Sequence, residues 1–470
     1  MTSTTRTVIE HLDRLATMDA DGHELSDAFV VVEDGIVRAV GSGDAPLDDA
    51  TTVVDGRGLV ALPGLVNTHH HFFQTLTRGL PAAQDVGLLT WESTNYPYWA
   101  RLDEEAVFAT AQVALAELLL SGCTTTSDQL YAFPKHSGGA VAMLGAEIEA
   151  ARGLGIRIHA TRGGVDVGPD AGGSRAMEFI EATDAILASM DEAISRYHDG
   201  SPGSMVRIGL GPNGVTVCTE DLMRGCVALA EARDVTLHTH VAEIPDEAAY
   251  TQAHFGMRPI ERLAELGWIG DRTWLAHAVY LDSGDIERIA AAGTAVAHCP
   301  TSNMRLASGA APVLEMLDAG VIVGLGVDGS ASNDSGNLLA EARQALLLSR
   351  VRELGALMTT RQALAMATSG GARALRRDDV GAIEPGRQAD IAMFRLPEIA
   401  GAGFESDPIA ALVLGATPRA RHVLVGGRFV VRDERLVNGD ETEIAARHRA
   451  TVARLVGGNS SELPGAIASA

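Results

Sequence analysis

The chain has 470 residues, enough for a large barrel and a smaller second domain. Its net charge of −24 argues against nucleic acid as a partner, because acidic side chains repel phosphates. Apolar runs too short for a membrane span, and four scattered cysteines without a C-x-x-C pair, predict a cytoplasmic protein with no membrane partner.

Both ends of the chain have the pattern of antiparallel β structure. The N-terminal region alternates apolar and polar positions between turn signals, as in AFVVVEDGIVRAVGSG. The same pattern returns late in the chain, in RARHVLVGGRFVVRDERLVNG. Neither end has enough strands to close a core by itself, so we expect one β-sandwich domain made of residues 1–63 and 382–456. The small, polar segment 457–470 is expected to be a flexible tail.

Between these ends, residues 64–381 alternate short apolar runs with long helical stretches such as EEAVFATAQVALAELLLSG. Strand–helix alternation repeated eight times predicts an α/β fold, the TIM-type (β/α)8 barrel. The alternative is a doubly wound open sheet. Almost every run ends in His, Asp, Glu, Asn or Gln, where barrel active sites are built, and this favours the barrel. The runs are GLVNTHHH, GCTTTSDQ, IRIHATRG, MVRIGLGP, VTLHTHVAE, TWLAHAV, TAVAHCP and VIVGLGVDG.

Histidines gather at the ends of two of these runs. Alternate residues of a strand point the same way, so we expect His69 and His71 to face the barrel interior and His70 to face the helices. In the fifth run His240 lies nearer the barrel mouth than His238, which we expect to be buried and hydrogen-bonded. Two imidazoles on one face are half of a zinc site, although a histidine triplet alone can be a chance cluster near a turn.

Two further runs add polar groups to the same rim. The sixth run contributes His277 and the eighth contributes Asp328. Each of these residues alone could be a core polar group satisfied by hydrogen bonds. Because imidazoles and a carboxylate from four strands converge on one rim, we expect a functional site there.

Longer segments carry a family resemblance. The chain resembles the amidohydrolase superfamily in its metal motif, PGLVNTHHH, and in HTHVAE, LAHAV and VDGSASND, which follow in that family's order. A narrower resemblance, to the bacterial branch that holds 8-oxoguanine deaminases and hydrolases of s-triazine herbicides, lies in THHHFFQTLTRGLP, HCPTSNMRLASG and VGLGVDGSASNDSGNLL. The resemblance covers nearly the whole chain, and it implies a homodimer or a larger homo-oligomer.

The resemblance implies one divalent metal ion, zinc or iron, with ligands His69, His71, His240 and Asp328. Two-metal members of the superfamily usually carry a bridging lysine at the end of the fourth strand. Here that position reads RIGLGPNG, and the chain's single lysine, Lys135, lies after the second run. A site with one metal ion is therefore expected.

The resemblance also implies catalytic roles for three residues. A metal with an open position lowers the pKa of bound water to about 7, and His277 lies beside that water. Asp328 can take the water's proton and pass it to the leaving amine. Glu243, three residues past His240, can protonate the ring nitrogen beside the attacked carbon, unless it is a solvated loop carboxylate.

Ring substrates need flat apolar walls and amide partners. The segment after the first run supplies aromatic residues, some of which can be structural, because Trp and Tyr often pack a helix on a barrel. Amides that follow strands both donate and accept hydrogen bonds, which suits the edge of an oxopurine. The substrate contacts that we expect are Gln74, Trp91, Trp99, Gln129 and Asn303.

These features favour a metal-dependent aminohydrolase, a hydrolase of C–N bonds that deaminates 8-oxoguanine or a related oxopurine and releases ammonia. Because Asp328 is present, proton transfer to an amine leaving group is available. The alternative is an s-triazine hydrolase that removes chloride or an alkylamine. The segments RGGVDVGPDAGG and GPNGVTVCTEDL resemble the triazine hydrolases more closely than the 8-oxoguanine deaminases. A non-catalytic scaffold on this fold would have lost metal ligands, and all of the expected ligands are present.

Overall fold

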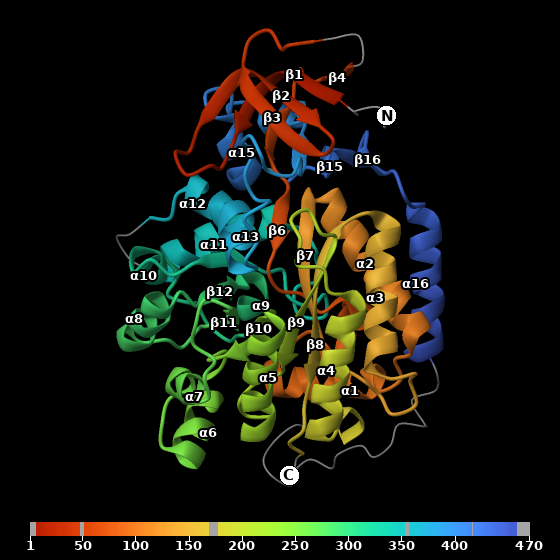
Figure 1. Ribbon diagram of the computed structural model, residues 1–470, viewed down its shortest axis with the longest axis vertical. Coiled ribbons are helices and arrows are strands. Elements are labelled where there is room, and N and C mark those ends of the chain that lie inside the picture. The colour runs from red at the N-terminus through yellow and green to blue at the C-terminus, as the bar shows by residue number, and fades with distance from the viewer. Residues whose placement is uncertain (1–5, 48–50, 169–176, 353–356, 416, 458–470) are drawn as a thin grey trace.

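The computed structural model describes residues 6–47, 51–168, 177–352, 357–415 and 417–457. Two bodies lie along its long axis, a helix-covered barrel and a smaller β-sheet domain above it (Figure 1). The predicted flexible tail, residues 457–470, lies outside the described residues except for Gly457.

Within the described ranges, eight parallel strands close into a barrel in the order β10-β11-β12-β13-β6-β7-β8-β9. Each strand therefore lies beside its neighbours in sequence, and the last strand meets the first. The predicted TIM-type (β/α)8 barrel is confirmed, and each strand overlaps one of the eight apolar runs. The strands are β6 (Leu65–Asn67), β7 (Cys123–Leu130), β8 (Arg157–Gly164), β9 (Val206–Pro212), β10 (Thr236–Val241), β11 (Thr273–His277), β12 (Ala295–His298) and β13 (Val323–Leu325).

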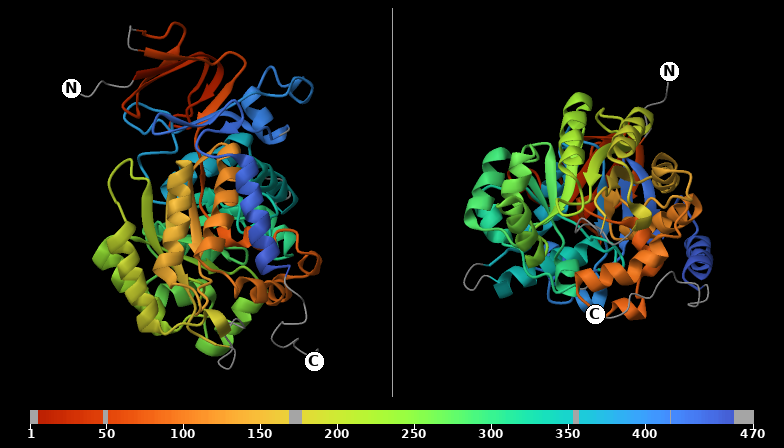
Figure 2. Two further views of the ribbon diagram at one scale, coloured as in Figure 1. Left: turned by 90° about the vertical axis from the view of Figure 1, so that its right-hand side faces the viewer. Right: turned by 90° about the horizontal axis from the view of Figure 1, so that it is seen from below.

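Helices surround the barrel, as the view from below in Figure 2 shows. Local signals set where they begin and end. Helix α8 begins after Asp282, whose carboxylate accepts a hydrogen bond from the amide of Asp285, and ends at Gly293, whose φ of +72° suits a residue without a Cβ. The helices are α1 (Leu88–Trp99), α2 (Glu104–Leu120), α3 (Ala140–Leu154), α4 (Thr183–Tyr197), α5 (Glu220–Arg233), α6 (Pro245–Phe255), α7 (Pro259–Glu265), α8 (Ser283–Ala292), α9 (Pro300–Arg305), α10 (Val313–Asp318), α11 (Leu338–Arg352), α12 (Thr360–Ala365), α13 (Gly371–Ala374), α14 (Glu398–Gly401), α15 (Pro408–Leu414) and α16 (Glu441–Leu455).

The two chain ends together build the second sheet, which confirms the small β domain. Nine strands of the described residues are joined by hydrogen bonds, in the order β17-β16-β15-β14-β5-β1-β2-β3 with β4 beside β1. The antiparallel pair β5–β14 joins the N-terminal strands to the C-terminal ones. Apolar side chains of β1, β2, β5 and β14 form a core of their own. The strands are β1 (Arg6–Ala16), β2 (Glu24–Glu33), β3 (Ile36–Ser42), β4 (Thr51–Asp55), β5 (Val60–Pro63), β14 (Ile391–Phe394), β15 (Ala420–Val425), β16 (Arg428–Arg432) and β17 (Arg435–Leu436).

Helix α16 lies on the barrel side of the molecule. It packs along α2 (Figure 1). Arg454 pairs at 2.6 Å with Asp103, the residue before α2, and His448 Nε2 lies 3.1 Å from Oγ1 of Thr75, in the segment that follows β6. The predicted domain bounds, residues 1–63 with 382–456 and residues 64–381, stay predictions.

A buried ion pair joins the barrel to the β domain. Arg157, the first residue of β8, donates to Asp390 from Nε at 2.8 Å and from Nη2 at 3.0 Å. Both side chains are 1% exposed. The guanidinium also donates to the carbonyl of Gly203 and to the amide oxygen of Gln388, so its buried donors are satisfied, as a buried charge requires.

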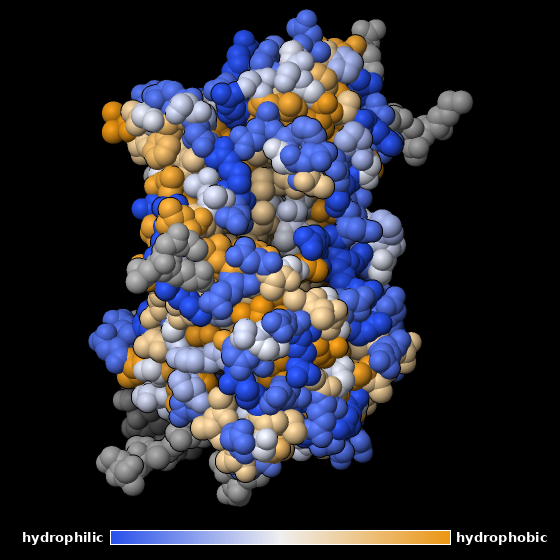
Figure 3. Space-filling model, turned by 90° about the vertical axis from the view of Figure 1, so that its left-hand side faces the viewer, coloured by the Kyte–Doolittle hydropathy of each residue, from blue (hydrophilic) through white to orange (hydrophobic). Residues whose placement is uncertain are grey.

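The surface drawn in Figure 3 carries hydrophilic side chains over much of both bodies, with hydrophobic groups between them. Among the described residues, no helix combines the length and the apolar character needed to cross a membrane.

Candidate metal centre and active site

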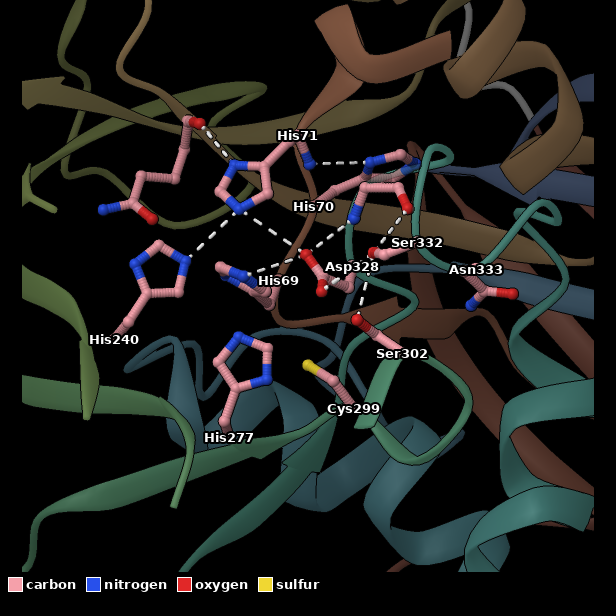
Figure 4. Close-up of polar contacts among 12 residues, drawn as sticks. His69, His70, His71, His240, His277, Cys299, Ser302, Asp328, Ser332 and Asn333 are labelled. Carbon is pink, nitrogen blue, oxygen red and sulfur yellow. Dashed lines mark hydrogen bonds and ion pairs between the residues drawn. The ribbon is translucent and has the colours of Figure 1, made fainter. Parts of the chain in front are cut away.

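Four imidazoles and one carboxylate meet at the C-terminal ends of the barrel strands. His69 and His71 follow β6, His240 lies in β10, His277 ends β11 and Asp328 follows β13. Figure 4 shows these side chains directed toward one point. One ligand atom each of His69, His71 and Asp328 lies within 4.8 Å of the others, and the same holds for His69, His240 and His277. The structure thus brings together every residue predicted to bind the metal.

The histidine triplet differs from its prediction in one respect. Strand β6 ends at Asn67, so the triplet lies just beyond the strand rather than inside it. The alternation of side chains nevertheless continues, because His69 and His71 face the common point while His70 points away from it (Figure 4). The ring of His70 instead accepts a hydrogen bond from the amide of His71 at 2.8 Å.

The ring nitrogens that face away from this point determine the tautomers. His71 Nδ1 lies 2.7 Å from the carbonyl oxygen of Gln129, and His240 Nδ1 lies 2.7 Å from the carbonyl oxygen of Asn213. A carbonyl can only accept, so each Nδ1 carries the proton and each Nε2 holds a free lone pair. These two Nε2 atoms lie 3.3 Å apart. Two lone pairs at that distance repel each other unless a cation lies between them.

The remaining donor atoms fit the same cation. His69 Nε2 has no hydrogen-bond partner among the described residues. Asp328 Oδ1 lies 3.4 Å from His69 Nε2 and 3.5 Å from His71 Nε2. Imidazole nitrogens with a carboxylate oxygen are a donor set for zinc or another divalent transition metal. The chemistry of the donors and the orphaned nitrogen both fit such an ion.

Burial sets the charge states of these groups. It lowers the pKa of His71 to about 4 and moves the pKa of His69 well below its usual range, so both rings are neutral, as metal binding requires. Burial acts against ionisation of Asp328 as well, but the close contact with His69 and the other surrounding imidazoles hold the pKa of Asp328 well below its usual range. Asp328 is therefore a carboxylate.

Asp328 is held in an unusual backbone conformation. Its φ is +61°, and that of His277 is +71°, in the left-handed region that residues with a Cβ rarely adopt. The amide of Gly329 donates to Asp328 Oδ1 at 2.6 Å, and Ser332 Oγ donates to Oδ2 at 3.2 Å. Ser302 Oγ in turn donates to Ser332 Oγ at 3.0 Å. These contacts fix one carboxylate oxygen toward the histidines (Figure 4).

His277 and Glu243 face each other on the other side of the site. His277 Nε2 lies 3.7 Å from Glu243 Oε2, and its Nδ1 donates to Asn303 Oδ1 at 2.9 Å. Ser308 Oγ donates to Glu243 Oε1 at 3.5 Å. Burial raises the pKa of Glu243 to about 7, so this carboxyl can hold or release a proton near neutral pH, as a general acid must.

A cavity of about 310 Å³ lies in front of this cluster, a size that suits a small ring compound. His71, His240, His277, Glu243 and Asp328 all contribute to its lining. Aromatic and aliphatic side chains form much of the remaining lining. They include Leu88, Trp91, Tyr96, Tyr131 and Leu306.

Two of the predicted substrate contacts line the cavity. Trp91 contributes one wall, and its indole N–H donates to the carbonyl of Ala331 at 3.0 Å, which fixes the ring. Gln74 also lines the cavity and is buried, with its amide oxygen against Gly329. A Cβ at position 329 would collide with that amide, so the glycine provides its space.

The other three predicted contacts lie behind the wall. Trp99 is fully buried and donates its indole N–H to Thr77 Oγ1 at 3.0 Å. The side-chain amide nitrogen of Gln129 donates to the carbonyl of Gly211 at 2.7 Å. The backbone carbonyl of Gln129 contacts the metal cluster, through His71. Asn303 orients His277. None of these three residues is part of the cavity lining, so they support the site and do not form its surface.

Sequence reasoning missed Tyr131 and Glu247. Tyr131 directly follows β7, and its place after a barrel strand was a usable signal. Glu247 lies in the first turn of α6 and accepts a hydrogen bond from the amide of Glu243 at 3.2 Å. No local pattern separates it from an ordinary acidic residue at a helix start.

Comparison with known proteins gives concordant matches. The model of the Amidohydrolase family matches residues 60–430. The 8-oxoguanine deaminase of Pseudomonas aeruginosa is 43% identical over 444 residues, which cover 94% of this chain and 98% of that protein. The hydroxydechloroatrazine ethylaminohydrolase of Pseudomonas sp. (strain ADP) is 34% identical over 470 residues, covering 97% of each chain. Among solved structures, the atrazine chlorohydrolase TrzN of Arthrobacter aurescens TC1 complexed with zinc has a TM-score of 0.91 at 37% identity, covering 95% of this chain and 100% of its own.

Proposed function

Because this chain belongs to the amidohydrolase family, we propose that it is a metal-dependent aminohydrolase that deaminates 8-oxoguanine or a closely related oxopurine. One observation carries the proposal: Glu243, a carboxyl able to donate a proton near neutral pH, faces His277 across a ring-sized cavity that the metal cluster lines. The printed name of the Pseudomonas aeruginosa relative supports the choice of ring.

We propose a single divalent ion, zinc or iron, held by His69, His71, His240 and Asp328. The converging lone pairs support this donor set, and so does the zinc present in the related chlorohydrolase structure. When bound, such an ion supplies a Lewis acid that makes water acidic enough to ionise near neutral pH.

The protein's own residues then move the protons. Glu243 protonates the ring nitrogen beside the carbon that carries the amine, which makes that carbon electrophilic. His277 donates through Nδ1 to Asn303, so its Nε2 is free to accept a hydrogen bond from the attacking water and orient it. Asp328 takes the first proton of the water and passes it to the amine, which leaves as ammonia. The second proton of the water returns to Glu243 as the carbon–oxygen bond becomes a carbonyl, so both carboxyl groups recover their starting states. The ring gains a carbonyl in place of its amino group.

The test is ammonia release by protein of known metal content. The panel comprises 8-oxoguanine, guanine, isoguanine, a pterin, melamine, atrazine and an N-alkylamino triazine. Ammonia from an oxopurine, with about one metal ion per chain, is the expected result. Metal-loaded protein that releases nothing from any oxopurine would overturn the proposed ring.

The second candidate is hydrolysis of an s-triazine with loss of chloride or an alkylamine. It is favoured by the TM-score of 0.91 to the atrazine chlorohydrolase and by the apolar cavity walls, such as Leu88 and Leu306. Chloride or alkylamine from the triazines, without ammonia from the purines, is the result that would select it.

We also propose a cytoplasmic homo-oligomer. The four cysteines are free and buried, which suits a reducing compartment. Light scattering coupled to gel filtration would give the number of subunits. A monomeric mass would contradict the proposed homo-oligomer.

A further inference from the structure

A closed circuit of hydrogen bonds lies behind the metal cluster. His69 Nδ1 lies 2.8 Å from His238 Nε2, and His238 Nδ1 lies 2.8 Å from the carbonyl oxygen of Trp274. The indole N–H of Trp274 donates at 2.9 Å to the carbonyl of Thr68, the residue before His69. The circuit therefore returns to its starting point and ties together the segment after β6, β10 and β11. All four residues are fully buried.

Only one placement of the imidazole protons satisfies every hydrogen bond of the circuit. The carbonyl of Trp274 can only accept, so His238 carries its proton on Nδ1 and presents a lone pair at Nε2. His69 must then donate from Nδ1, which leaves its Nε2 as the lone pair directed at the cluster. Stacking reinforces the arrangement, because the rings of His238 and Trp274 lie 4.4 Å apart with an interplanar angle of 15°. The carbonyl of Trp274 therefore determines the tautomer of His69, because His238 lies between them in the circuit.

The circuit is needed because His69 differs from the other two histidines of the cluster. His71 and His240 donate to backbone carbonyls, those of Gln129 and Asn213. His69 donates instead to a side chain, and that side chain has to be forced into the role of acceptor, because a neutral imidazole can equally well donate. The Trp274 carbonyl supplies that constraint. The acceptor is also uncharged, so it orients His69 without adding a negative charge beside the metal site.

We propose that His238 is a positioning residue of the metal centre, which holds His69 in its metal-binding tautomer through the circuit closed by Trp274. The proposal rests on the metal site of the proposed function and is independent of its substrate. Outer hydrogen-bond partners of metal ligands change metal affinity by about 10- to 100-fold when removed.

The experiment measures the dissociation constant of Zn²⁺ by competition with a chelator, using metal-stripped protein. His238→Leu has similar bulk but no hydrogen bonds, and we expect it to weaken Zn²⁺ binding at least tenfold. His238→Gln keeps one acceptor and one donor, and we expect it to recover most of the affinity. His159→Gln is the matched control. His159 is buried and lies edge-on to Trp274 at 5.2 Å, but it bonds to Thr236 Oγ1 and to no residue of the cluster.

Wild-type Zn²⁺ affinity in His238→Leu would overturn the inference. An equal loss of affinity in His238→Gln would also overturn it, because the bulk of the side chain rather than its hydrogen bonds would then be responsible.

A second measurement needs no variant. The ¹⁵N shifts of the His238 ring in wild-type protein should show a protonated Nδ1 and an unprotonated Nε2; a protonated Nε2 would overturn the inference. If wild-type protein binds no metal, the proposed function fails; if wild type and His238→Leu bind equally, only this inference fails.

Discussion

Replacement of Glu243 by glutamine should separate metal binding from catalysis. The amide has nearly the shape of the carboxyl but cannot transfer a proton, and Glu243 is not among the residues that converge on the metal position. Loss of a general acid costs about 100- to 10,000-fold in kcat, or about 3–5 kcal/mol of activation free energy. Glu243→Gln should therefore keep its metal and lose nearly all turnover.

The pH dependence of the wild-type enzyme gives the second part of this prediction. Burial raises the pKa of Glu243 to about 7, and the active form is the protonated one. The rate is therefore highest at acid pH and falls by about tenfold for each pH unit above the pKa of Glu243. The bound metal ion stabilises the carboxylate, so in the metal-loaded enzyme this alkaline limb begins below pH 7.

The assay is steady-state ammonia release between pH 5.5 and 9.5, with metal content measured for each sample. Glu147→Gln is the matched control, because Glu147 is a buried carboxyl that does not line the cavity. Its profile should equal that of the wild type. The acid role is refuted if Glu243→Gln keeps more than about a tenth of the wild-type kcat, or if its profile still shows the alkaline limb.

Three further predictions concern stability and metal content. Burial raises the pKa of Glu147, and of Asp128 beside it, well above the usual range. The folded state thus holds protons that the unfolded chain releases, so its stability is complete below the unfolded carboxyl pKa of about 4 and declines as pH rises. Glu147→Gln should unfold at a higher temperature than wild type at pH 9 and show little gain at pH 5; equal gains at both pH values would contradict this. Asp390→Ala leaves the charge of Arg157 buried and unpaired, and should lower stability by about 3–5 kcal/mol in chemical denaturation, whereas a loss below about 1 kcal/mol would show that the pair contributes little. Chelation should abolish activity and lower the unfolding temperature, and added Zn²⁺ should restore both; activity that survives complete metal removal would exclude the proposed role of the ion.

The barrel and the metal cluster were predictable because periodic patterns carry them. Almost every run combined apolar character with a polar residue at its end, and parallel strands necessarily bring those ends together. His69, His71, His240 and Asp328 could be found this way, because a barrel has one rim at which carboxyl ends meet. The triplet also kept its alternation beyond the end of β6.

The cavity wall was less predictable, because position after a strand does not give the direction of a side chain. Gln74 follows the first run and Gln129 ends the second, yet Gln74 enters the cavity and Gln129 turns toward Gly211. Trp99 and Trp91 lie two helical turns apart, and only the packing of α1 against its neighbours decides which one reaches the cavity. These outcomes depend on contacts between distant segments, and the sequence has no local signal for them.

The composite β sheet has a consequence for synthesis on the ribosome. Strand β5 emerges early, but its antiparallel partner β14 begins only at Ile391. At a translation rate of about 5–20 residues per second, one edge of β5 waits roughly 15–70 seconds for that partner. During this interval the N-terminal strands expose an unpaired edge, which is a template for pairing with other nascent chains. The barrel, whose strands are all neighbours in sequence, can close in the meantime, so the first strands to be made are among the last to complete their sheet.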